Sequence, residues 1–169
     1  MQASELHAEV VELRHLAVPA IERLLAAYGL ELVALPVATE IPASYWGAPE
    51  AGIAGRCVFA RADTPAHSLL HEMCHYVCMP ASRRTALWRD AGGSDDEECA
   101  VCYLQVLLAD ALPGLGRERL LADLDRWGYT FREGSAAAWF AGDGRAARDW
   151  LHAERLIDAE DRPTLRLRR

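Results

Sequence analysis

The sequence contains no lysine and no asparagine: all 18 of its Lys+Arg residues are arginine. The absence of lysine excludes a lysine Schiff base and a lysine general base from any mechanism. No run of apolar residues approaches the roughly 20 that a membrane-spanning helix needs. The first nine residues carry acids and no basic start, so we expect no secretory signal, no membrane association and a cytoplasmic location.

The charge balance is acidic, with 25 Asp+Glu residues, a formal net charge of -7 and a pI near 5.3. This balance argues against nucleic acid or an anionic membrane as the main partner. A length of 169 residues and a 51% hydrophobic share predict one globular domain spanning residues 1–169. The cysteine count is odd, at five, which favours a reducing compartment over a disulfide framework. Nothing in the sequence indicates an oligomeric state.

Hydrophobic periodicity predicts an α+β fold, with a small mixed sheet packed on one helix and a mostly helical C-terminal half. Two strands are expected at 31–37 and 56–61, the second as a short edge strand. The Pro- and Gly-rich stretch 40–55 predicts a loop. The expected helices cover residues 4–28 (kinked or split at Pro19), 63–79, 96–111, 117–127, 135–141 and 145–153.

The most informative motif is His71-Glu72-Met73-Cys74-His75, an HExxH pattern inside the helix expected at 63–79. Spacing i,i+4 places both imidazoles on one helix face, where they can bind a single metal ion. Glu72 follows the first histidine directly, a position from which a carboxylate can act as general base on a water molecule at the metal. The motif therefore predicts a metalloenzyme, with metal ligands His71 and His75 and catalytic Glu72.

A third ligand is expected from the next helix, which begins with four consecutive acids at 95–98. Such a run also occurs at helix N-termini simply because the macrodipole favours negative charge there. Spacing leaves both Glu97 and Glu98 open as the ligand. Two histidines and a carboxylate suit Zn²⁺ with an open position, and equally the facial triad of Fe²⁺ oxygenases.

The two histidines, Glu72 and a downstream helical glutamate resemble a minimal gluzincin. That resemblance implies a zincin-like fold, zinc, and peptide hydrolysis, with the strand near 57–61 as the edge on which a peptide backbone pairs. Gluzincins commonly have a small residue three positions after the glutamate ligand. Glu97 is followed by Ala100 in this way, so the resemblance favours Glu97 over Glu98.

A second, more local resemblance is to the bacterial elongation factor P hydroxylase family. It is carried by the HExxH motif, the aromatic Tyr76 and the pair Arg83-Arg84, and it covers about 14 residues well and about 40 loosely. It implies a redox metal and hydroxylation of a lysine-derived side chain. The segment from Arg84 to the acidic helix is short here, and the rest of the chain does not align. Arg83 and Arg84 are candidate substrate-binding residues or plain surface charges.

Several other side chains are weaker candidates. Tyr45 and Trp46 lie in the Pro- and Gly-rich loop, where they can line a substrate pocket. His67 is a group that supports the ligands, an alternative metal ligand or a partly buried polar residue, and we expect the last. Four cysteines on the two helices either bind a structural zinc or pack as small apolar side chains, and we expect packing. No spacing selects a group to stabilise a reacting oxygen among Tyr76, Tyr103, Tyr129 and His152, and we expect core positions for Trp88, Trp127, Trp139 and Trp150.

Three functions follow from these residues. The first is a zinc-dependent hydrolase of the metallopeptidase type that acts on a peptide or protein. The second is an iron(II) oxygenase or hydroxylase that uses the same ligands. The third is a metal-stabilised binding module without catalysis.

Overall fold

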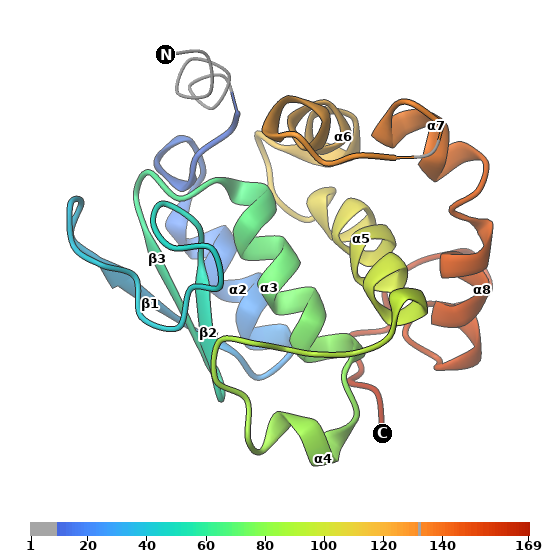
Figure 1. The fold of residues 1–169 in the computed structure, drawn as a ribbon, viewed down its shortest axis with the longest axis horizontal. Helices are drawn as coiled ribbons and strands as arrows, with labels where there is room; N and C mark the ends of the chain where they lie inside the picture. Colours follow the sequence, from blue (N-terminus) through green and yellow to red (C-terminus); the bar gives the residue numbers. More distant parts are fainter. Residues whose placement is uncertain (1–9, 132) are drawn as a thin grey trace.

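The computed structural model describes residues 10–131 and 133–169, which form a mixed α+β structure (Figure 1). Its elements in chain order are the 3-10 helix η1 (Leu13–His15), α2 (Val18–Ala27), β1 (Glu31–Leu35), β2 (Gly52–Ala54), β3 (Cys57–Arg61), α3 (Ala66–Cys78), α4 (Ala81–Arg84), α5 (Asp95–Ala109), α6 (Gly116–Trp127), α7 (Ala136–Ala141) and α8 (Arg145–Ala153).

The first predicted helix is split near Pro19, one of the two outcomes expected for that proline. Its described part consists of η1 and α2, and residues 4–9 lie outside the described residues. Pro19 occupies the first turn of α2 and does not kink a longer helix. A proline is tolerated in the first turn because the amide hydrogen that it lacks has no partner inside the helix there.

The sheet has the order β1-β3-β2, with β1 parallel and β2 antiparallel to β3. The prediction of an edge strand at 56–61 is therefore wrong: β3 is the central strand. The error arose because β2 has only three residues and lies inside the predicted loop. Gly52 permits this strand, since a Cβ there would lie 1.9 Å from the Pro42 carbonyl oxygen.

The outer edge of β2 is covered by two chain segments. The Ile53 amide donates to the Ala43 carbonyl (3.2 Å), and the Ile53 carbonyl accepts from the Arg89 amide (2.9 Å). Isolated bridges join Ser44 to Gly52 and Ala54 to Trp88. Both backbone groups of Ile53 on this side are thus paired within the chain.

The helix that carries the HExxH motif is the centre of the molecule. Figure 1 shows α3 between the sheet and α5, and every residue of α3 except His71 is buried. Its apolar side chains Leu69, Leu70, Met73 and Val77 are fully buried in the core. This burial makes α3 a rigid support for the polar side chains that it carries.

The helices predicted for the C-terminal half are confirmed. Ser94 caps α5, its hydroxyl accepting from the Glu97 amide, and Gly128 ends α6 in the left-handed conformation. The core position expected for Trp88 is wrong: its side chain is 64% exposed, because it follows α4 in an irregular segment and not on a helix. None of the described helices combines the length and apolar character needed to cross a bilayer.

Candidate metal centre

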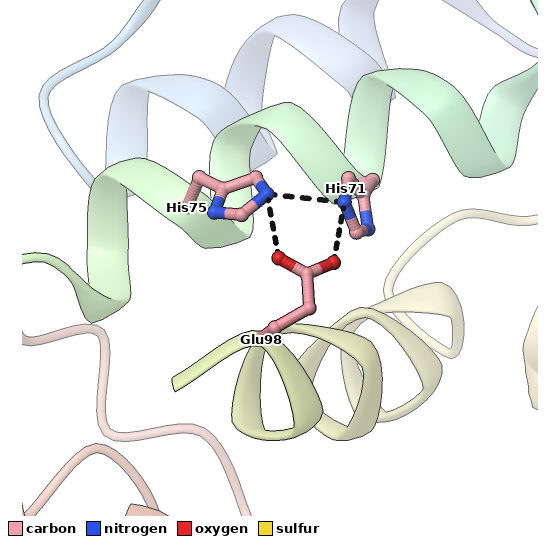
Figure 2. Close-up of side chains that lie close together, drawn as sticks. All are labelled: His71, His75 and Glu98. Carbon is pink, nitrogen blue, oxygen red and sulfur yellow. Dashed lines mark hydrogen bonds and ion pairs between the residues drawn. The ribbon is translucent and has the colours of Figure 1, made fainter. Parts of the chain in front are cut away.

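Three side chains from two helices converge at one point (Figure 2). The Nε2 atoms of His71 and His75, on α3, lie 3.1 Å apart. The Glu98 carboxylate, on α5, reaches both: Oε1 lies 3.2 Å from His71 Nε2, and Oε2 lies 3.3 Å from His75 Nε2. Among the described residues, this is the one grouping of His, Cys, Asp or Glu that could hold a metal ion.

The spacing of these atoms fits a metal ion. An ion bound at about 2.0 Å to each ligand in a tetrahedron spaces the ligand atoms about 3.3 Å apart. The two imidazole nitrogens, 3.1 Å apart, lie close to that value, and each has a different oxygen of the Glu98 carboxylate at 3.2 or 3.3 Å. One ligand atom from each of the three residues can be chosen so that all lie within 4.8 Å of one another. Imidazole nitrogens and carboxylate oxygens are ligands of both Zn²⁺ and Fe²⁺. The donor set is therefore suitable for a divalent transition metal without specifying which.

The structure brings Glu98, and not Glu97, to the histidines. Glu97 is buried at 4% exposure and accepts hydrogen bonds from Arg83 and from Arg168 Nη1, the latter at 3.1 Å. Consecutive helical residues point about 100° apart, so one of the two glutamates can face α3 while the other faces the arginines. Glu97 is an ion-pairing residue in this fold, which corrects the choice that the gluzincin spacing favoured.

Gln105 was missed by sequence reasoning. Its Oε1 atom lies 2.8 Å from His71 Nδ1, and its side chain is fully buried. The available signal was a single polar amide within the apolar stretch of α5, because such a residue indicates the face of the helix that meets the polar side chains of α3. Counting back seven residues, or two helical turns, from Gln105 leads to Glu98.

A cavity of about 290 Å³ opens on this cluster. Tyr45 and Trp46, predicted as pocket residues, line it, and they are 54% and 76% exposed. The complete lining is Tyr45, Trp46, Glu50, Ser68, His71, Glu72, His75, Arg89, Asp90, Ala91, Gly92, Glu98 and Tyr129.

The arginine pair lies elsewhere. Arg83 contacts Glu97, and Arg84 donates to the backbone carbonyls of Met79 and Arg168 and lies over the Tyr76 ring. Neither arginine lines the cavity. Their role in this structure is to hold the end of α3 against neighbouring segments.

Glu72 is a buried carboxylate at the cavity wall, 8% exposed. Burial raises its pKa from the ordinary 4.5 to about 7, against the opposing effect of His71, while Glu50 and Glu98 raise it further. A carboxylate with a pKa near neutrality can both take up and release a proton under ordinary conditions.

The two histidines differ in their electrostatic surroundings. Burial lowers the pKa of His75 to about 4, assisted by the neighbouring His71. Burial also acts to lower the pKa of His71, but Tyr129, Cys102 and Glu98 outweigh it and raise that pKa well above its ordinary value.

The remaining candidates are distributed around this centre. His67 is buried, at 1% exposure, with its ring against those of Trp127 and Tyr129. Of the four groups considered for stabilising a reacting oxygen, Tyr129 alone lines the cavity. Cys74 and Cys78 are buried as expected of packing residues, whereas Cys99 is exposed. The thiols of the described residues form no metal-binding group.

Comparison of the chain with protein-family models, with curated proteins and with solved structures finds no match. The geometry of the site therefore carries the functional argument by itself.

Proposed function

We propose that this protein is a metal-dependent hydrolase of the metallopeptidase type, with a minimal zincin-like arrangement of helix and sheet. The observation that carries the proposal is the convergence of His71, His75 and Glu98 beside the buried carboxylate of Glu72, all at one cavity. Two imidazoles and one carboxylate leave a position open on a tetrahedral ion, which is the pattern of catalytic and not of structural zinc sites.

In this proposal His71, His75 and Glu98 hold Zn²⁺. The chemistry that the ion supplies when bound is the lowering of the pKa of water towards about 7, which makes it a nucleophile at neutral pH. Glu72 takes up the proton of the attacking water and delivers it to the leaving amine of the peptide.

Two further groups have roles that follow from their position. Burial raises the pKa of Tyr129 to about 12, so its phenol stays protonated and can donate a hydrogen bond to a carbonyl oxygen that becomes negative. Tyr45 and Trp46, whose rings meet edge to face with centroids 5.0 Å apart, form an aromatic wall for the substrate.

The first test is the metal content of protein purified without added metal, combined with peptide hydrolysis. We expect about one zinc ion per chain, and loss of that ion in His71→Ala, His75→Ala and Glu98→Ala. His152→Ala is a matched control, because His152 pairs with Asp161 outside the cavity and its loss leaves the metal content unchanged. Unchanged metal content in His71→Ala would remove the basis of the site.

The second test separates hydrolysis from oxidation. Glu72→Gln keeps the shape of the side chain and should retain zinc while losing hydrolysis of a mixed peptide library, measured by mass spectrometry. Iron as the bound metal, together with turnover that depends on oxygen, would contradict the peptidase proposal and favour the hydroxylase alternative. Zinc binding with no effect of Glu72→Gln on any activity would favour the binding-module alternative.

A further inference from the structure

The amide of Gln105 is the most deeply buried polar group that touches the metal centre. It lies at 0% exposure between Leu104 and Val106, in the apolar part of α5. A buried amide without a partner is destabilising, so its retention here calls for a specific contact. That contact is the 2.8 Å hydrogen bond between Gln105 Oε1 and His71 Nδ1.

With the amide oxygen facing His71, this hydrogen bond places a ring hydrogen on Nδ1. Oε1 of an amide can only accept, so Nδ1 must be the donor. In the neutral ring the lone pair is then on Nε2, the atom that faces His75 and Glu98. With the opposite tautomer, the N–H bond would point at the place where a metal ion binds.

We infer that Gln105 is a positioning residue, which selects the tautomer of His71 that can bind metal and fixes the orientation of its ring. The inference rests on the proposed function insofar as His71 is a metal ligand there. Gln105 and Glu98 are separated by two turns on one face of α5, so a single helix supplies both a direct ligand and the group that orients a second ligand. The docking of α5 on α3 thereby sets the geometry of the whole centre.

The amide of Gln105 can also favour the other tautomer of His71, in which Nε2 carries the hydrogen and cannot bind a metal ion. Among the described residues, Gln105 Nε2 has no hydrogen-bond partner, so only the contact with His71 orients the amide at this end. Rotation of the amide by half a turn would present Nε2 to Nδ1 and favour a hydrogen on His71 Nε2. A carboxylate at position 105 cannot make this exchange, because both of its oxygens accept.

The inference is tested with three variants of the full chain. Gln105→Leu removes the acceptor with little change in side-chain size, and Gln105→Glu keeps an acceptor. Val106→Ala is the packing control: Val106 is equally buried on α5, but its side chain points about 100° away from that of Gln105. The measurements are the dissociation constant for Zn²⁺, by competition with a chromophoric chelator, and the thermal midpoint of the metal-free protein.

We expect Gln105→Leu to weaken zinc binding about 10- to 100-fold, as loss of the partner of a ligating histidine typically does. Gln105→Glu should restore binding to within a few-fold of the native protein. Val106→Ala should lower the thermal midpoint and leave the dissociation constant unchanged. Equal zinc affinity in Gln105→Leu and the native chain would overturn the inference, as would failure of Gln105→Glu to restore binding.

The tautomer is measured directly by nuclear magnetic resonance of protein with isotope-labelled histidine, with His71 assigned by comparison with His71→Gln. We expect Nδ1 of His71 to carry hydrogen, and Nε2 to carry none, in the zinc-loaded protein and in the metal-free protein at a pH where the ring is neutral. A neutral ring with hydrogen on Nε2 in the metal-free protein would overturn the inference. If the native chain takes up no metal, the proposed function fails, while this spectrum still decides the role of Gln105.

Discussion

The adjacent residues Glu97 and Glu98 offer the sharpest prediction, because the structure gives them opposite roles. Glu97 is an acceptor for two arginines, and its side chain is 5% exposed. Glu98 faces the two histidines, and its side chain is 49% exposed. Replacing each with glutamine changes charge but hardly changes shape, so the two variants isolate the electrostatic part of each role.

The magnitude for Glu97→Gln follows from its burial. Breaking a fully buried ion pair by neutralising one partner costs about 3–5 kcal/mol. Arg83 and Arg168 keep 34% and 24% of their side-chain exposure, so water compensates them in part. We therefore expect a loss of about 2–4 kcal/mol in the free energy of unfolding, or a thermal midpoint lower by roughly 5–15 °C.

For Glu98→Gln the expected pattern is reversed. A half-exposed side chain contributes within about 1 kcal/mol to stability. The loss of one of three ligands should weaken zinc binding by more than about 100-fold, since even indirect partners of ligands contribute 10- to 100-fold. Urea unfolding of the metal-free proteins measures the first quantity, and chelator competition on the folded proteins measures the second.

The refuting result is the opposite assignment. If folded Glu97→Gln no longer binds zinc while Glu98→Gln binds it as the native protein does, then Glu97 is the ligand and the helix orientation described above is wrong. Loss of binding in both variants, with the fold intact, would also contradict the separation of roles.

Three more predictions concern the same region. The pKa of Glu72 is raised from 4.5 to about 7, so the native state binds more protons than the unfolded state between these values, and the free energy of unfolding falls by about 3 kcal/mol as pH rises through that window. Urea unfolding of the metal-free protein should therefore show that Glu72→Gln is stabilising above pH 7 and has little effect below pH 4.5. An equal effect of the substitution at both pH values would refute this. Gly93 has φ +113°, and a Cβ there would lie 2.8 Å from Glu97 Oε1, so Gly93→Ala should lower the free energy of unfolding by about 1–3 kcal/mol, measured by urea unfolding. Gly92 also has a positive φ, but a Cβ there would meet no atom within 4 Å, so Gly92→Ala measures the backbone strain without the clash. Trp46→Ala, at an exposed cavity wall, should raise KM for peptides with little change in kcat, and a lower kcat at unchanged KM would assign the indole another role.

Most of the fold was predictable because its signals are local. The periodicity of α3, α5 and α6 and the stop signals at Gly128 and Pro113 lie within single stretches of sequence. The order of the strands in the sheet could not be predicted in this way, because it depends on pairing between distant stretches of sequence. The three-residue β2 has no alternating pattern of its own, and it forms only because β3 and the segments at 43–44 and 87–89 pair with it.

The candidate site likewise has one part that local sequence predicts and another that depends on distant contacts. The HExxH motif marks two ligand positions and a base within five residues, and one helix face is enough to predict their grouping. The choice between Glu97 and Glu98 depends on how α5 is rotated about its axis when it packs on α3. That rotation is set by distant contacts, among them Arg168 with Glu97 and Gln105 with His71, which no local pattern contains.

The covered edge of β2 has a consequence for how a substrate would be chosen. Strand addition lets an enzyme hold any peptide, because every residue offers the same backbone groups. Here the backbone groups of Ile53 are already engaged by Ala43 and Arg89, and those two segments continue into the cavity-lining residues Tyr45 and Asp90. Under the proposed function, the Ile53 backbone therefore offers a peptide no free group to pair with, and a substrate at this edge would be held by the side chains that line the cavity.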